Sequence, residues 1–365
     1  MTRDAAFKSR VRDRMRKTGE RYATARARID TNAAAQASLD TESGVLHLTN
    51  GDSTVEVLRA TGLTGPILPW RDVLHDGPVP GGVSDAELRR IRADFLCSDG
   101  SRDPEAVRRG FEERDRLLEE YVNGEVVLWF EADLYDQLQI IQVLDQVRRL
   151  GMDPGRISLV SAGEFPGIAH FGGLGQLAPA DLVRLREDEI LLTQDDLDTA
   201  SVAWAAFTAT DPSGLEDVAR ASSRVLRYLG ESFGRLMQEY PAMSDGLALT
   251  QRRILLAVED GIGVAGEVFA ELGRRERRPY LGDTCCWATM AGLAAARQPL
   301  LALGDGEPFR TRSIALTEPG RAVLAGELDH LSANGIDRWI GGVHLSDART
   351  SWRYDARRET LVQPG

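Results

Sequence analysis

Four polar segments of this sequence hold most of the side chains that could do chemistry, and each follows a short apolar run. They are residues 50–53, 70–78, 131–137 and 161–164. Their aspartate, glutamate and histidine side chains can exchange protons or bind cations, and their glycines let a ligand approach the backbone closely. Because four segments of similar character follow successive apolar runs, we expect their side chains to line one polar crevice.

The residues that we expect to carry catalysis lie in the first two segments: His75, Asp72, Asp52 and Ser53. His75 is the preferred acid–base group, because it lies between Asp72 and Asp76, whose carboxylates would raise its pKa towards a working value. Asp52 and Ser53 also fit a structural role, since either side chain could cap the helix that follows.

A serine hydrolase is one alternative for the same residues. Gly51-Asp52-Ser53 resembles the first block of Gly-Asp-Ser hydrolases, in which the serine is the nucleophile. Asp72 and His75 have the Asp-x-x-His spacing with which such enzymes orient the base. In that family the second block lies near the C-terminal end of the domain, and the glycine and asparagine blocks of the oxyanion hole are not evident between the two here.

A further set of residues is expected to contact a ligand. A glycine turn that leads into a helix N-terminus forms an anion site, so we expect a small anionic or phosphorylated ligand. No Walker-type G-x-x-x-x-G-K-[ST] motif occurs, and the cofactor stays unknown. The glycine-rich run 170–175 lacks a strand–turn–helix context and is interpreted as a flexible loop or lid. The ligand-binding candidates are His47, Asn50, Gly51, Trp70, Asp76, Gly77, Glu131, Asp133, Asp136 and Gln137.

Some of these residues have simpler interpretations. His47 lies inside an apolar run, where a half-buried histidine of the core fits as well. Asp133 and Asp136, three residues apart, resemble a helix cap and a favourable charge in the first helical turn. Together with Glu131 and the pair Asp72 and Asp76, they would suit Mg²⁺ or Mn²⁺ rather than zinc, but the spacing demands no metal, and no metal ligand is assigned.

Alternating short apolar runs and longer helical patterns predict an α/β fold with a Rossmann-like, largely parallel sheet. We expect strands at 45–49, 66–69, 126–130 and 157–160. Helices are expected between and after them, including one long helical region over 214–240. In such sheets ligands bind beyond the carboxyl ends of the strands, where the polar segments lie.

The chain is expected to comprise a basic helical hairpin at 1–30, a linker at 31–44, the α/β domain at 45–243 and a mainly α, winged-helix-like domain at 244–365. The last prediction rests on element order. Three helices, at 249–258, 265–272 and 283–296, precede a strand at 314–317 and a helix at 318–328. A β-hairpin is then expected to pair residues 339–345 with 351–355.

Charge and composition indicate which classes of partner the protein is expected to bind. The net charge of −12 disfavours nucleic acid, although residues 1–30 hold ten basic and four acidic side chains and could form a basic arm. No apolar run is long enough for a membrane helix, so we expect no membrane partner and a cytoplasmic location. The three cysteines, Cys97, Cys285 and Cys286, fit neither a disulfide framework nor a zinc site and are expected to be reduced.

Two specific runs, 46–53 and 68–78, together with the later runs 128–130 and 133–138, resemble the bacterial family called domain of unknown function 1835. The resemblance covers residues from about 45 to 240, and the segment 247–355 resembles the companion region that members often carry. The family has no established activity. The resemblance therefore implies a domain boundary and transfers no catalytic residue.

The sequence thus favours an α/β domain that binds a small anionic ligand or acts on it, with its site at the carboxyl ends of the strands. One alternative is a nucleic-acid-associated regulator that uses the basic arm and the winged-helix-like domain. The other is the Gly-Asp-Ser hydrolase. Whether the protein is an enzyme stays open at this point.

Overall fold

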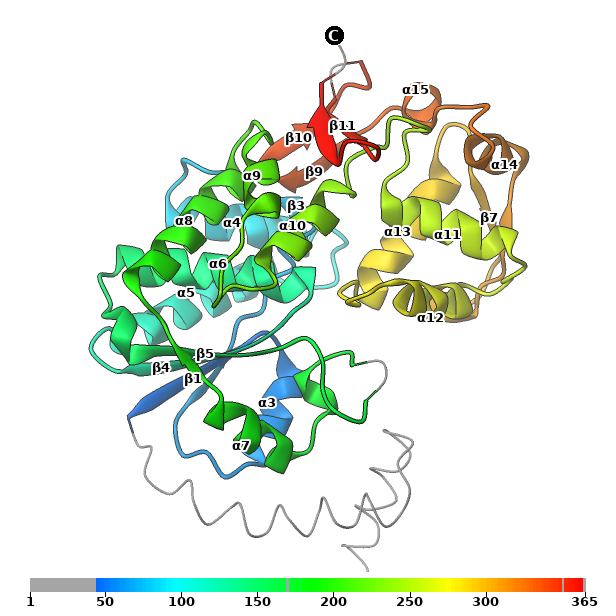
Figure 1. Ribbon diagram of the computed structural model, residues 1–365. Coiled ribbons are helices and arrows are strands. Elements are labelled where there is room, and N and C mark those ends of the chain that lie inside the picture. The colour runs from blue at the N-terminus through cyan, green and yellow to red at the C-terminus, as the bar shows by residue number, and fades with distance from the viewer. Residues whose placement is uncertain (1–43, 169–170, 350, 364–365) are drawn as a thin grey trace, which may run out of the picture. The chain divides into compact units, whose positions relative to one another are not determined.

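The computed structural model describes residues 44–168, 171–349 and 351–363, and the chain divides into two compact units (Figure 1). The first unit comprises, in its described part, residues 44–72, Arg109–Ala132 and most of Gln139–Ser201. The second comprises Val73–Arg108, Asp133–Leu138 and most of Val202–Gly365. The predicted helical hairpin at 1–30, and all but the last residue of the predicted linker, lie outside the described residues.

A five-stranded sheet in the order β2-β1-β4-β5-β6 forms the centre of the first unit. The first four of these strands run parallel, and the edge strand β6 pairs antiparallel with β5. Apolar and β-branched side chains dominate the parallel strands, as expected where both faces are buried. The prediction of an α/β protein with a largely parallel sheet is confirmed. The strands are β1 (Val45–Thr49), β2 (Ile67–Pro69), β4 (Glu125–Glu131), β5 (Ile157–Ala162) and β6 (Ile190–Leu191).

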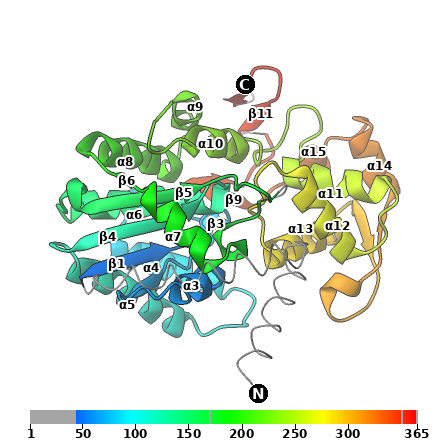
Figure 2. The same cartoon turned by 60° about the horizontal axis from the view of Figure 1, so that its bottom comes forward.

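Helices cover both faces of this sheet (Figures 1 and 2). Val45, Val127 and Val160 point to one face and share a core cluster with Leu58 of α3 (Asp52–Arg59) and Leu182 of α7 (Pro179–Glu187). The alternate residues of the same strands point to the opposite face, on which α6 (Leu134–Arg149) lies. This layering holds the strands rigidly, so that the positions of their carboxyl ends are fixed.

The register brings those carboxyl ends to one edge of the sheet. Thr49 of β1 lies opposite Pro69 of β2 and Trp129 of β4, and Glu131 at the end of β4 lies opposite Ala162 of β5. The turns that follow these four strands therefore start at the same edge, as the sequence predicts.

In the second unit a small sheet joins distant parts of the sequence. The two-residue strand β3 (Gly77–Pro78) pairs parallel with β9 (Arg338–Gly341), and β9 pairs antiparallel with β10 (Val343–Leu345). The predicted hairpin is therefore wrong in its pairing. Gly341, with φ of 57°, lets the chain turn back at once, while β11 (Arg353–Asp355) pairs with β12 (Thr360–Val362) instead.

The C-terminal helical region of this unit has its own core. The helices α11 (Leu249–Glu259), α12 (Ala265–Arg275) and α13 (Asp283–Ala295) pack around buried aliphatic residues and are confirmed close to their predicted bounds. An antiparallel pair that the sequence analysis missed in part, β7 (Leu301–Leu303) with β8 (Ile314–Leu316), completes this core.

Two predicted helices differ in extent. The helical region expected over 214–240 is two helices, α9 (Gly214–Arg220) and α10 (Leu229–Met237), because the Ser223 hydroxyl accepts hydrogen bonds from the Val225 and Leu226 N–H groups in the segment between them. The helix expected at 318–328 ends earlier, as α14 (Glu318–Leu324), close to the left-handed Gly326.

The remaining elements connect these parts: α4 (Asp85–Leu96), α5 (Pro104–Glu120), α8 (Gln194–Thr208), α15 (His330–Asn334), and three 3₁₀ turns, η1 (Pro154–Arg156), η2 (Leu174–Gln176) and η3 (Phe309–Thr311). Among the residues that the structure describes, no helix has the length and apolar character needed to cross a bilayer.

Candidate functional site

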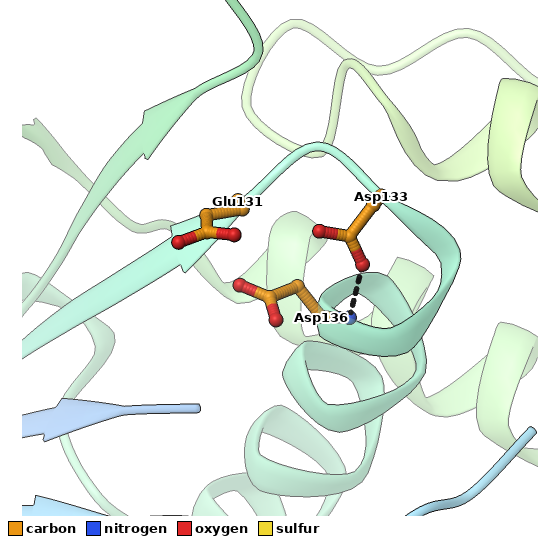
Figure 3. Close-up of side chains that lie close together, drawn as sticks. All are labelled: Glu131, Asp133 and Asp136. Carbon is orange, nitrogen blue, oxygen red and sulfur yellow. Dashed lines mark hydrogen bonds between the residues drawn. The ribbon is translucent and has the colours of Figure 1, made fainter. Parts of the chain in front are cut away.

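Three carboxylates converge where β4 ends and α6 begins. Glu131 is the last residue of β4, and Asp133 and Asp136 follow within the next five residues. One carboxylate oxygen of each lies within 4.8 Å of those of the other two, and the side chains turn towards one another (Figure 3). Glu131 and Asp133 are each 8% exposed, and Asp136 is fully buried. We call these three residues the carboxylate cluster.

The local backbone explains how the cluster is held. The Asp133 carboxylate accepts a hydrogen bond of 3.1 Å from the Asp136 N–H, and the Asp133 carbonyl accepts one from the Gln137 N–H. Asp133 therefore caps α6, as its simpler interpretation predicts. Capping engages one of its oxygens, and the first turn of α6 carries Asp136 to the same side.

The described part of the glycine-rich run, residues 171–175, packs against Glu131 of this cluster. The Leu174 N–H donates a hydrogen bond of 2.5 Å to Glu131 Oε1. Gly173 has a φ of 139°, and a Cβ on it would lie 2.6 Å from Glu131 Cδ. Sequence analysis missed this contact, although three glycines at 172, 173 and 175 were the available signal for a close approach of the backbone.

The chemistry of the cluster is that of a hard-cation site. Three carboxylates in so small a volume repel one another, and burial removes most of the water that would screen them. A divalent cation held by several carboxylate oxygens would offset both costs, and Mg²⁺ and Mn²⁺ prefer such ligands.

The turn after β1 lies at the same edge of the sheet. Gly51 occupies the N-cap position of α3 with an extended backbone and no side-chain cap, so the interpretation of Asp52 or Ser53 as the cap is wrong. Ser53 is exposed, and a Cβ on Gly175 would lie 3.0 Å from its Oγ. The glycine-rich run thus contacts both Ser53 and Glu131. Asn50 Oδ1 lies 3.5 Å from the Thr54 hydroxyl as its hydrogen-bond acceptor.

Asp52 is engaged in an exposed ion pair. Its carboxylate accepts hydrogen bonds of 2.5 and 3.3 Å from the Arg71 guanidinium. This hydrogen bonding lowers the pKa of Asp52 below its usual range. A carboxylate held in this way is a weak proton acceptor, which disfavours Asp52 as a general base.

Two of the ligand-binding candidates pack inside the first unit. His47 is fully buried, and its Nδ1 accepts a hydrogen bond of 3.1 Å from the Trp129 indole N–H. Burial, with a smaller contribution from Arg186, lowers the pKa of His47 to about 4. Trp70 is also fully buried, and its indole N–H donates to Gln142 Oε1. Both side chains have clear roles in the core.

The pKa of His75 shifts in the direction opposite to the one that the sequence suggests. Burial lowers its pKa to about 4 despite the opposing effects of Asp76 and Glu239, so the expectation of a raised pKa is wrong. Neither ring nitrogen has a hydrogen-bond partner among the described residues. The hydrolase alternative, in which Asp72 and Ser53 pair with His75, stays a prediction.

Comparisons with known proteins do not assign the chain to a family. No known protein-family model matches the chain, and no curated protein matches it significantly. The resemblance to the domain of unknown function 1835 stays a prediction.

The loop around His75 belongs to the second unit and is held by Arg92, a residue that sequence analysis missed. The Arg92 guanidinium donates to the carbonyl oxygens of Val73, Asp76 and Pro78. Gly77 in the same loop has a φ of 75°, and its missing side chain makes room for the ring of Phe95. His75 and Asp76 both line a cavity of this unit.

Of the predicted site residues, the structure therefore brings together Glu131, Asp133 and Asp136 as a cluster of possible ligands. The buried Gln137 follows in the same turn of α6, and Ser53 contacts the run that covers Glu131. Asp72 is buried, and its carbonyl accepts a hydrogen bond from Gln139. That all the predicted residues share one crevice stays a prediction.

Proposed function

We propose that the α/β region binds a divalent cation, Mg²⁺ or Mn²⁺, through the carboxylate cluster and that it uses this cation to bind a small anionic, phosphate-bearing ligand. The observation that carries the proposal is the convergence of Glu131, Asp133 and Asp136 within 4.8 Å in a buried environment. A cation held in this way would leave coordination positions for oxygens of the ligand, as Mg²⁺ does in phosphate-binding sites.

The sheet topology supports this position. In the order β2-β1-β4-β5, the chain leaves β1 towards β2 on one side, and the later strands β4 and β5 lie on the other. The order therefore reverses between β1 and β4, and in Rossmann-like sheets ligands bind beyond the carboxyl ends of the strands at such a point. Glu131 ends β4, and Ser53 lies in the first turn of α3 directly after β1, so both follow from the strands that flank this reversal.

The helix ends at this edge support an anionic ligand. The N-terminus of α3 follows β1 directly, and Gly51 places no side chain over the first N–H groups of the helix. Unpaired N–H groups and the helix dipole favour negative charge at such an end. The carboxylate cluster alone would repel an anion. A bound cation would offset this repulsion, so that an anionic ligand could bind beside the cluster at the N-terminus of α3.

A thermal-shift experiment on the full chain tests this proposal. Mg²⁺ and Mn²⁺ should each raise the melting temperature, and inorganic phosphate should raise it further only when the cation is present. Glu131→Gln should abolish both effects. Glu125→Gln is the matched control, because Glu125 lies exposed at the other end of the same strand. Equal shifts in the two variants would overturn the proposal.

A second proposal concerns the C-terminal region. We infer a winged-helix-like fold, because α11, α12 and α13 are followed by the β7–β8 pair and an isolated bridge joins Val264 to Ser313. This order favours a nucleic-acid-associated role as the second candidate function. However, α13, which corresponds to the recognition helix, contains no lysine or arginine. A low-salt gel shift with and without residues 1–30 tests this role, and identical mobility shifts would exclude the basic arm.

A further inference from the structure

A cavity of about 670 Å³ lies in the second unit. His75 and Asp76 line it from the loop before β3, Tyr280 from the segment before α13, and Cys285 and Ala288 from α13 itself. Its volume falls within the range of sites for small organic ligands. None of the carboxylate cluster lines it, so it is separate from the proposed cation site.

His75 supplies the polar group that most needs a partner in this cavity. The residue is 9% exposed, and both ring nitrogens lack a hydrogen-bond partner among the described residues. Its ring packs edge-on against Tyr280, with centroids 5.1 Å apart, and against Tyr135 at 5.8 Å. Buried polar atoms are nearly always hydrogen-bonded, so an imidazole held like this points to a ligand that completes it.

Among the described residues, the one arginine that lines the cavity is already paired within the protein. The Glu239 carboxylate pairs with Arg235 at 2.8 Å and with Arg338 at 2.9 Å. Of the described residues that line the cavity, Arg338 is the only arginine or lysine. With its positive charge engaged by Glu239, no cationic group is left to attract an anion. Asp76 and Asp337 add carboxylates to the lining, so the charge of the cavity disfavours an anionic ligand.

The protonation states of His75 and Cys285 favour a ligand that is bound through neutral hydrogen bonds. Burial lowers the pKa of His75 to about 4, so at neutral pH its ring offers one N–H donor and one acceptor. Burial, followed by Asp76, raises the pKa of Cys285 to about 12, so this thiol stays protonated. His75 and Cys285 thus present neutral hydrogen-bonding groups to the cavity.

One wall of the cavity is made largely of small residues. Cys285, Ala288, Thr289 and Gly292 recur at helical spacing along α13 and line the cavity together, and Ala296 follows just after the helix. Small side chains let a ring lie against the helix, and the aromatic ring of Tyr280 adds an apolar surface.

We propose that this cavity binds an uncharged, flat nitrogen heterocycle, of the size of a nucleobase or nicotinamide, which forms a hydrogen bond with a ring nitrogen of His75. The proposal is independent of the cation site, and either can fail without the other.

Titration of the full chain with cytosine, uracil, adenine and nicotinamide at neutral pH tests it. The imidazole resonances of His75 are followed by NMR and are assigned as those missing from His75→Phe. At least one probe should shift them in a saturable way, with a Kd of roughly 0.1–1 mM for a ligand of this size. Failure of all four probes to shift them at about 5 mM would overturn the proposal.

Matched variants of α13 locate the binding. Ala288→Leu places a larger side chain in the cavity and should weaken the binding of that probe about tenfold or more. Ala295→Leu makes the same change on the same helix at a residue that does not line the cavity, and it should leave the Kd unchanged. Unaltered binding in a folded Ala288→Leu protein would place the probe elsewhere and would contradict the proposal.

Discussion

The Glu131 carboxylate occupies the space that a side chain on Gly173 would need. A Cβ at Gly173 would lie 2.6 Å from Glu131 Cδ, and the Gly173 φ of 139° is itself unfavourable for other residues. This relationship ties the glycine-rich run to the carboxylate cluster.

Gly173→Ala should therefore destabilise the protein and disturb the cluster. We expect a loss of roughly 1–3 kcal/mol in the free energy of unfolding, measured by urea denaturation, because the loop must move away from Glu131. Gly51→Ala is the control, since no atom lies within 4 Å of a Cβ there and its φ of −159° is ordinary extended backbone. Equal stability of the two variants would show that the run does not close on Glu131.

Glu239 should be among the most important charges for stability in the second unit. Burial alone would raise its pKa, but Arg235 and Arg338 lower it to about 2, so it stays ionised at neutral pH. Glu239→Gln leaves Arg338 without its buried counter-charge and Arg235 with Glu276 as its remaining partner, and it should cost about 3 kcal/mol in urea unfolding. Glu87→Gln breaks an exposed pair with Arg90 and should cause no measurable change. A similar small effect for both would contradict this account of the pair.

Acid should destabilise the fold through two buried histidines. The pKa values of His47 and His75 are lowered from 6.5 to about 4 in the folded state, so the unfolded chain takes up their protons first. The free energy of unfolding should therefore fall as the pH drops from 6.5 towards 4, by roughly 1–2 kcal/mol per histidine by about pH 5.

The variant His75→Phe separates this contribution from the others. This variant lacks the proton that His75 takes up on unfolding, so its free energy of unfolding should depend less on pH over that range. Urea unfolding at several pH values measures this dependence. The variant should also gain stability relative to the wild type in acid. An unchanged pH dependence would mean that His75 is not buried in its neutral form.

The parallel sheet was predictable because its information is local. The runs that form β1, β4 and β5 are apolar, end at polar turn residues and alternate with helical patterns, and parallel connection then brings their carboxyl ends to one edge. The convergence of Glu131, Asp133 and Asp136 follows from the same logic, since all three lie within six residues of the chain.

What could not be predicted depends on pairings between distant residues. Gly77–Pro78 has no strand pattern of its own and becomes β3 only because it meets β9, far away in the sequence. Leu174 donates to Glu131 across 43 residues. The carboxylates beside His75 suggested a raised pKa, but rings such as Tyr280 bury it and reverse the direction. Burial by distant residues leaves no local signal in the sequence.

The most direct measurement for the central claim is a titration of the full chain with Mn²⁺, followed by the loss of the free Mn²⁺ signal in electron paramagnetic resonance. The proposal predicts one saturable site per chain that Mg²⁺ displaces, and that is lost in Asp136→Asn but kept in Glu125→Gln, whose exposed carboxylate lies outside the cluster. Absence of saturable binding, or the same affinity in Asp136→Asn as in the wild type, would contradict it.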